Sequence, residues 1–176
     1  QREFFDEISS LPALDAHTHL VGGKLSARGL HDILLYHMSI SDLYAAGCKD
    51  AGRLTEYPAW PTRDEAIIRI ERALPFLDVS RNTSTAWCIR RILSDLYAWK
   101  APVTADNWRK LDDLIRERAD DRAWQREVVR QTGIRQFVTE FARREEGQDD
   151  DLLQYALEWG FFTRCQAGEF DTALCE

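Results

Sequence analysis

The sequence contains no apolar run that approaches the roughly 20 residues of a membrane-spanning helix. It also lacks an excess of basic residues, because 23 Lys and Arg stand against 30 Asp and Glu and the formal net charge is -7. No basic patch of the kind that binds nucleic acid or an anionic membrane stands out. The chain opens on polar residues rather than on a signal peptide. We therefore expect a cytoplasmic protein with no nucleic-acid or membrane partner.

Metal and redox motifs built on cysteine are absent. The four cysteines are scattered and form no C-x-x-C pair, which argues against a zinc knuckle or a thiol redox motif, and we interpret them as reduced and structural. Histidine is confined to the start of the chain, since all four histidines lie within the first 37 residues. No later histidine is left to complete a metal site.

Apolar residues are present in the amount that a packed core requires: 44% of the 176 residues are hydrophobic, with 6 Trp, 8 Phe and 5 Tyr. Helical patterns dominate from residue 60 onward. Thr62 and Glu65 have the spacing of a capping box, which predicts a helix over about 63–75. Further helices are predicted to begin near 82–84, near Thr104 and near 120–121, and the last should end at Gly133.

Strand signals are few. The clearest strand covers Ala13 to Leu20, and a second covers 134–141, which is rich in β-branched and aromatic residues. A third strand around 159–164 is a weaker prediction, because 149–159 favours a helix. The apolar face of the first strand needs a helical layer to cover it, so we expect this strand to be central in its sheet.

Polar side chains share one face of the first predicted strand. Successive side chains of a strand point to opposite faces, so Asp15, His17 and His19 lie together. Two imidazoles separated by one residue can bind one metal ion, and a catalytic zinc takes three protein ligands, so His17 and His19 would form part of a site. Asp15 could orient a histidine or simply cap the strand. A chance, exposed pair of histidines also has this spacing.

The stretch Leu14-Asp15-Ala16-His17-Thr18-His19-Leu20 resembles the first-strand D-x-H-x-H motif of the amidohydrolase superfamily. Residues 30–47, LHDILLYHMSISDLYAAG, resemble the helical region that follows this motif in uronate (glucuronate) isomerases, and weaker similarity continues to residue 114. Only the histidine motif is specific. The resemblance implies an α/β fold, namely the amino-terminal part of a metal-dependent (β/α)8 barrel. A large helical insertion over about 25–132 would follow the first strand, so that residues 1–176 would be mostly α-helical.

The uronate isomerases interconvert aldose and ketose forms of sugar acids such as glucuronate. The resemblance therefore implies a metal-dependent isomerase with a small-molecule sugar acid as its partner and a divalent metal, zinc or else manganese, at His17 and His19. A proton would move between two substrate carbons through an enediol. Two alternatives stay open: an amidohydrolase-type hydrolase in which the metal activates water, and a non-catalytic helical interaction domain. Assembly into a homo-oligomer is also left open.

The helical region departs from the family pattern. Uronate isomerases show Asp-His-Tyr-Lys-Trp-Arg before the Ala-Asn-Gly that ends this helix, and alignment on Gly47 places there Tyr36-His37-Met38-Ser39-Ile40-Ser41. Met38 replaces the family tyrosine and Ser41 the family arginine. His37 is retained, and with Tyr36 from the neighbouring position it is the candidate catalytic pair, although a shift of one residue turns a helical side chain by about 100°. A purely structural His37 fits equally well. We expect a divergent, isomerase-like enzyme.

Two other features involve residues outside the metal motif and the candidate catalytic pair. Arg90 and Arg91, beside Trp87, could bind a carboxylate, yet paired arginines on an amphipathic helix are more often solvated. His31 has no family counterpart and is interpreted as structural.

A (β/α) barrel needs at least about 200 residues and commonly about 250. We therefore expect residues 1–176 to form a single unit that is the incomplete amino-terminal part of a larger barrel domain. The remaining strands and metal ligands would lie beyond Glu176 or come from another chain.

Overall fold

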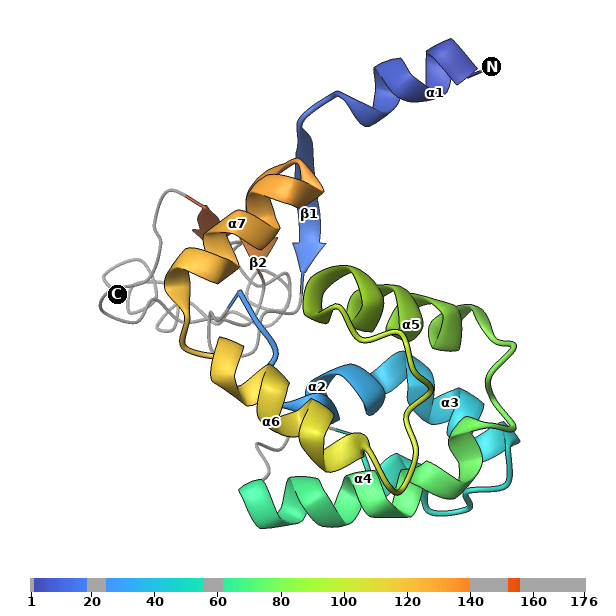
Figure 1. Ribbon diagram of the computed structural model, residues 1–176. Helices are drawn as coiled ribbons and strands as arrows, with labels where there is room; N and C mark the ends of the chain where they lie inside the picture. The colour runs from blue at the N-terminus through green and yellow to red at the C-terminus, as the bar shows by residue number, and fades with distance from the viewer. Residues whose placement is uncertain (1, 19–24, 56–61, 140–151, 156–176) are drawn as a thin grey trace, which may run out of the picture. The chain divides into compact units, whose positions relative to one another are not determined.

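The computed structural model describes residues 2–18, 25–55, 62–139 and 152–155 (Figure 1). The described elements, in chain order, are α1 (Arg2–Ser9), β1 (Ala13–Thr18), α2 (Leu30–Leu34), α3 (His37–Ala45), the 3-10 helix η2 (Ala51–Arg53), α4 (Arg63–Leu77), α5 (Ser84–Tyr97), α6 (Trp108–Arg118), α7 (Arg122–Thr132), β2 (Ile134–Thr139) and β3 (Leu153–Tyr155). The described chain is thus mostly helical with a small parallel sheet, as the sequence predicts. None of its helices has both the length and the apolar character needed to cross a bilayer.

The chain divides into two compact units. The first, which we call the sheet unit, comprises Gln1–Leu25 and Arg126–Glu176, and the second, the helical unit, comprises Ser26–Gln125. The helical insertion predicted over about 25–132 includes all of the helical unit. The larger barrel domain stays a prediction.

The sheet unit contains parallel strands in the order β1-β2-β3. Asp15 of β1 is opposite Phe137 of β2, and Phe137 is opposite Leu153 of β3. Parallel neighbours need a long crossover connection, and the chain between β1 and β2 contains the whole helical unit. The strands predicted over 13–20 and 134–141 are confirmed, although the described strands end at Thr18 and Thr139.

The prediction that the first strand is central is wrong for the described strands. β1 lies at the end of the order β1-β2-β3, and Leu14 is 60% exposed. The physical reason is that the helices of the helical unit bury their apolar faces against one another, in a core that includes no described residue of β1. A separate, small core in the sheet unit is formed by Val129 and Phe137 with Leu25, Ile134 and Leu152 around them.

The helix predicted over 149–159 is also wrong where the structure describes it, because Leu153–Tyr155 form β3. The backbone N–H of Phe137 donates to the carbonyl of Leu152 over 2.8 Å, which begins the pairing of β3 with β2. An open strand edge offers backbone partners, and this non-local gain outweighs a local helical preference. The strand predicted around 159–164 lies outside the described residues.

Caps and turns fix the ends of the helices in the helical unit. The predicted capping box is confirmed: the Glu65 N–H donates to Oγ1 of Thr62, and the Thr62 N–H donates to Oε2 of Glu65 over 2.7 Å. α5 begins after its cap, Thr83. The third helix starts later than predicted, at Trp108, because Thr104 instead begins a turn in which its N–H donates to Oδ1 of Asn107. Gly133, at φ +70°, follows the last residue of α7.

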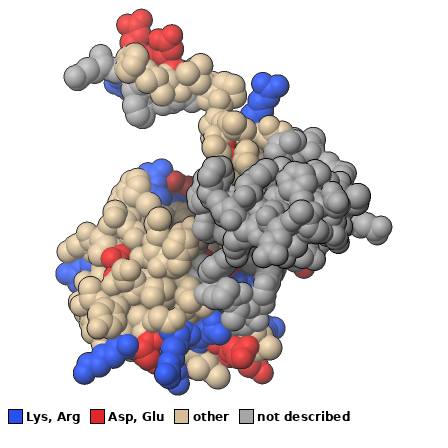
Figure 2. All heavy atoms as spheres, turned by 180° about the vertical axis from the view of Figure 1, so that it is seen from behind, with Lys and Arg blue, Asp and Glu red and all other residues tan. Residues whose placement is uncertain are grey.

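The helical unit has one main core. Figure 1 shows α2 and α3 in the middle of this unit with α4, α5 and α6 around them. α2 packs on α4 and α6, and α3 packs on α4 and α5. The largest fully buried side chains include Leu30, Leu34, Leu43, Ile70, Leu111 and Ile115. Ser26 and Gln125, the first and last residues of the unit, are joined by a 3.0 Å hydrogen bond. On the face shown in Figure 2, acidic and basic side chains of the described residues lie close to one another along the lower edge.

Candidate functional site

The predicted metal-binding motif lies near the carboxyl end of β1. Asp15 and His17 occupy strand positions two residues apart, His17 directly precedes the last residue of the strand, and Asp15 is half-buried. His19 lies outside the described residues. Among the described residues, no group of three or more His, Cys, Asp and Glu is arranged to hold a metal ion. A metal ion at this strand end would therefore need His17 and His19 together with a further ligand.

Tyr36 and His37 lie at the start of α3. Tyr36 is the residue before the helix, His37 is its first residue, and both are half-buried. The centroids of their rings are 4.1 Å apart at an interplanar angle of 47°. The structure thus brings the two candidate catalytic residues together within the helical unit, whereas His17 belongs to the sheet unit. Met38, at the position of the family tyrosine, is 62% exposed, and Ser41, at the position of the family arginine, is also exposed.

A buried group of charged residues near the start of α2 was missed by the sequence interpretation. We call it the charge cluster, and it consists of Arg28, His31, Asp32, Asp112 and Arg116. The guanidinium of Arg28 donates to both carboxylate oxygens of Asp32, over 2.6 and 2.9 Å. Burial by itself would raise the pKa of Asp32, but the hydrogen bonds and charge of Arg28, together with the neighbouring His31, outweigh it and hold that pKa below its ordinary value.

Asp112 connects this segment to α6. Its Oδ1 accepts a hydrogen bond from the Leu30 N–H over 2.8 Å, and its Oδ2 accepts one from Nε of Arg116 over 2.6 Å. Gly29 makes this close approach feasible, because a Cβ there would meet Oδ1 of Asp112 at 2.8 Å and the Arg116 guanidinium at 3.0 Å. The carboxylate therefore satisfies one backbone group and one cation at once.

His31 lies in the same cluster and is 3% exposed. Its Nε2 is 3.1 Å from Oδ1 of Asp32, but neither ring nitrogen makes a hydrogen bond within the described residues. Burial lowers the pKa of His31, and the charges of Arg28 and Arg116 lower it further, against the opposing effect of Asp32. The imidazole is therefore neutral at pH 7. Because it is shielded from solvent, the arrangement supports the structural role expected for it rather than an acid–base role.

The sequence offered a partial signal for this cluster. Arg28 and Asp32, and likewise Asp112 and Arg116, are four residues apart, which is the spacing of helical ion pairs. Nothing local indicates that the two pairs meet, since Leu30 and Asp112 are 82 residues apart in the sequence.

The two arginines beside Trp87 have different surroundings. Arg91 is paired with Asp95 over 2.6 Å, and its guanidinium lies 5.8 Å from the centroid of the Trp87 ring. Nη1 of Arg90 donates to the backbone carbonyl of Arg81 over 2.6 Å. Both arginines also border a cavity between α3 and α5, which is a second candidate binding site.

Comparison with known proteins adds no relative: no protein-family model matches the chain, and no curated protein matches it significantly.

Proposed function

We propose that this chain contributes part of the metal site of a metal-dependent, uronate isomerase-like enzyme. The proposal depends on one observation, the D-x-H-x-H pattern that begins on β1, a strand of a parallel sheet. Enzymes built on parallel (β/α) barrels place their active sites at the carboxyl ends of the strands, and His17 lies near that end of β1. The long helical crossover between β1 and β2 agrees with the insertion that the resemblance implies.

The proposed reaction moves a proton between adjacent carbons of a sugar acid. A divalent ion bound by His17 and His19 would supply polarisation of the substrate's carbonyl oxygen. Tyr36 and His37 each carry a group that can hydrogen-bond a substrate hydroxyl, and an imidazole can also serve as a general acid or base. Their rings lie 4.1 Å apart, so one bound substrate could contact both. Met38 and Ser41 lack the hydroxyphenyl and guanidinium groups of the family, so the substrate's carboxylate would be held differently.

The test measures metal content and reaction products of the full-length protein. Purified protein is loaded with zinc or manganese and incubated with glucuronate and related sugar acids, and the products are analysed by NMR and mass spectrometry. Isomerisation conserves the substrate's mass, whereas a hydrolase would add the mass of water. We expect bound metal and a product of unchanged mass. A protein that binds no metal would contradict the proposal and favour a helical interaction domain.

A matched pair of variants on β1 links the metal to the motif. His17→Ala removes a proposed ligand, whereas Thr18→Ala alters the next residue of the strand, which lies outside the proposed ligand set. We expect His17→Ala to lose the metal and Thr18→Ala to keep it. Equal metal content in the two variants would place the ion elsewhere.

A further inference from the structure

The helical unit contains a cavity of about 660 Å³. This volume falls within the roughly 300–1,000 Å³ of small-molecule sites. Residues of α3, of the end of α4, of α5 and of the segment 99–104 line it, and all of them belong to the helical unit. Much of its wall is apolar and includes Leu43, Leu77, Ile89, Leu93, Pro102 and Val103. A ligand of this cavity needs an apolar body.

Two polar atoms in the lining are buried without a hydrogen-bond partner in the described part of the chain: Oδ2 of Asp42 and Nε1 of Trp99. Leaving such an atom without a partner carries a desolvation cost in free energy. The carboxylate oxygen needs a donor and the indole N–H needs an acceptor. A ligand that supplies both would remove the cost, so these atoms specify the polar groups of the ligand.

The backbone at the end of α5 accounts for the position of Trp99. Ala98 adopts a left-handed conformation, with φ 54°, and the Trp99 N–H donates to the Leu93 carbonyl over 2.9 Å. This cap turns the chain back toward α5 and directs the segment 99–104 along the cavity.

The charges that border the cavity favour an anion. Four basic residues, Arg81, Arg90, Arg91 and Lys100, line it together with two acidic residues, Asp42 and Asp78. Arg81 is paired with Asp78, and Arg91 is paired with Asp95. Within the described residues, Arg90 and Lys100 have no ion pair, and Arg90 donates only to a backbone carbonyl.

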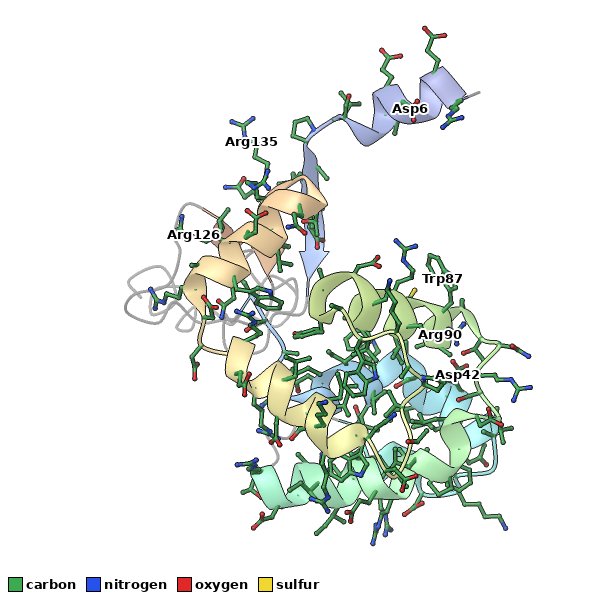
Figure 3. All side chains as sticks on the ribbon, viewed as in Figure 1. Asp6, Asp42, Trp87, Arg90, Arg126 and Arg135 are labelled. Carbon is green, nitrogen blue, oxygen red and sulfur yellow. The ribbon has the colours of Figure 1, made fainter. Side chains whose placement is uncertain are left out.

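Figure 3 shows Arg90 and Trp87 on α5 and Asp42 on α3, the helix that packs against α5. A cationic ligand would be repelled by this border, so the donor for Asp42 must be a neutral group such as a hydroxyl.

We propose that this cavity binds a small organic acid with an apolar ring system and a hydroxyl group. The hydroxyl donates to Oδ2 of Asp42, while the carboxylate pairs with Arg90 and one of its oxygens accepts from Nε1 of Trp99. Its described lining residues include none of β1, and Met38 and Ser41 do not line it.

Three related compounds test the polar groups of the ligand on the full-length protein. The probe is 6-hydroxy-2-naphthoate, and the comparison compounds are 2-naphthoate, which lacks the hydroxyl, and the methyl ester of the probe, which lacks the charge. Binding is measured by isothermal titration calorimetry. We expect saturable binding of the probe and about tenfold weaker binding of each comparison compound, because each lacks one hydrogen-bonded or ionic contact. No saturable binding, or equal affinity for all three compounds, would overturn the proposal.

Variants then assign each contact to a residue. In Asp42→Ala the probe and 2-naphthoate should bind with equal affinity, because the partner of the hydroxyl is gone. In Arg90→Gln the probe and its methyl ester should bind alike, and Trp99→Phe, which keeps the ring but removes the N–H, should weaken the probe about fivefold. Arg122→Gln, at an exposed residue of α7 outside the cavity, is the control and should bind like the wild type. The compound ratios report contacts only in folded protein, so circular dichroism accompanies each titration. Unchanged ratios in folded Asp42→Ala and Arg90→Gln would refute the assignment.

Discussion

Asp112 shows how one carboxylate can be buried without destabilising the fold. Removing a charge from water is costly, and the cost is offset only when donors within the protein replace the lost water. Here Oδ1 accepts from the Leu30 N–H and Oδ2 accepts from Arg116, and Gly29 leaves space for both contacts. The residue is 3% exposed, so water can replace a lost partner only if the packing of α2 on α6 rearranges.

Asp112→Ala should therefore be strongly destabilising. It leaves the Leu30 N–H and the Arg116 guanidinium without their acceptor, and breaking a buried pair in this way costs about 3–5 kcal/mol of unfolding free energy. Asp113→Ala is the matched control, because Asp113 and its partner Arg63 are each 63% exposed and such surface pairs contribute at most about 1 kcal/mol. Chemical denaturation of both variants measures the difference. A similar loss in the two variants would show that the charge cluster contributes no special stability.

His31 should make the stability of the protein depend on pH. Its pKa in the folded state is lower than the ordinary value of 6.5, so the unfolded chain takes up a proton first as the pH falls. Its contribution is complete above pH 6.5 and decreases as the pH is lowered below that value, by at most about 1.4 kcal/mol per pH unit. His31→Phe removes this titration. Denaturation of both proteins between pH 5 and 8 should give a steeper pH dependence for the wild type, and parallel curves would contradict the prediction.

Among the helices, α5 is capped at its end by a residue, Ala98, whose backbone conformation is unfavourable for alanine. Ala98 has φ 54°, and a left-handed conformation costs roughly 1 kcal/mol for a residue with a Cβ. Glycine adopts this conformation without that cost. Ala98→Gly should therefore raise the unfolding free energy by about 0.5–1 kcal/mol.

The control for Ala98→Gly is Ala101→Gly. Ala101 is exposed and is not among the described residues with positive φ, so glycine there mainly adds freedom to the unfolded chain and should lower stability by about 0.4–1 kcal/mol. The two variants should thus shift the midpoint of thermal unfolding in opposite directions. Shifts of the same sign would mean that the left-handed cap does not determine the effect.

The sequence predicts the elements where the signal is local. The capping box at Thr62 and Glu65 and the glycine after α7 are complete within a few residues, so α4 and α7 follow from the sequence. β3 does not follow, because the hydrogen bond from Phe137 to Leu152 that begins its pairing depends on a strand elsewhere in the chain. The position of β1 at the end of the described strand order is non-local for the same reason.

At the scale of the whole molecule, the candidate sites also differ in whether their sequence signal is local or non-local. Asp15, His17 and His19 form a short pattern that the sequence displays directly, and the structure adds that the first two lie on a strand of a parallel sheet. The charge cluster and the cavity are formed by segments that are far apart in the chain, so no local sequence motif predicts them. The barrel and its chemistry stay predictions that depend on the resemblance of the motif.

The three histidines that have roles in the proposed function should respond differently to substitution. His17 and His19 are proposed ligands, and removing either leaves one imidazole, which cannot hold the coordination of the ion alone. His17→Ala and His19→Ala should therefore lose both metal and metal-dependent turnover. His37 is the first residue of α3 and is proposed to contact the substrate, so His37→Ala should lower turnover but keep the metal. Metal content is measured by mass spectrometry beside turnover for each variant. Full metal occupancy and unchanged turnover in His17→Ala would overturn the proposed function, whereas loss of metal in His37→Ala would make that residue a ligand.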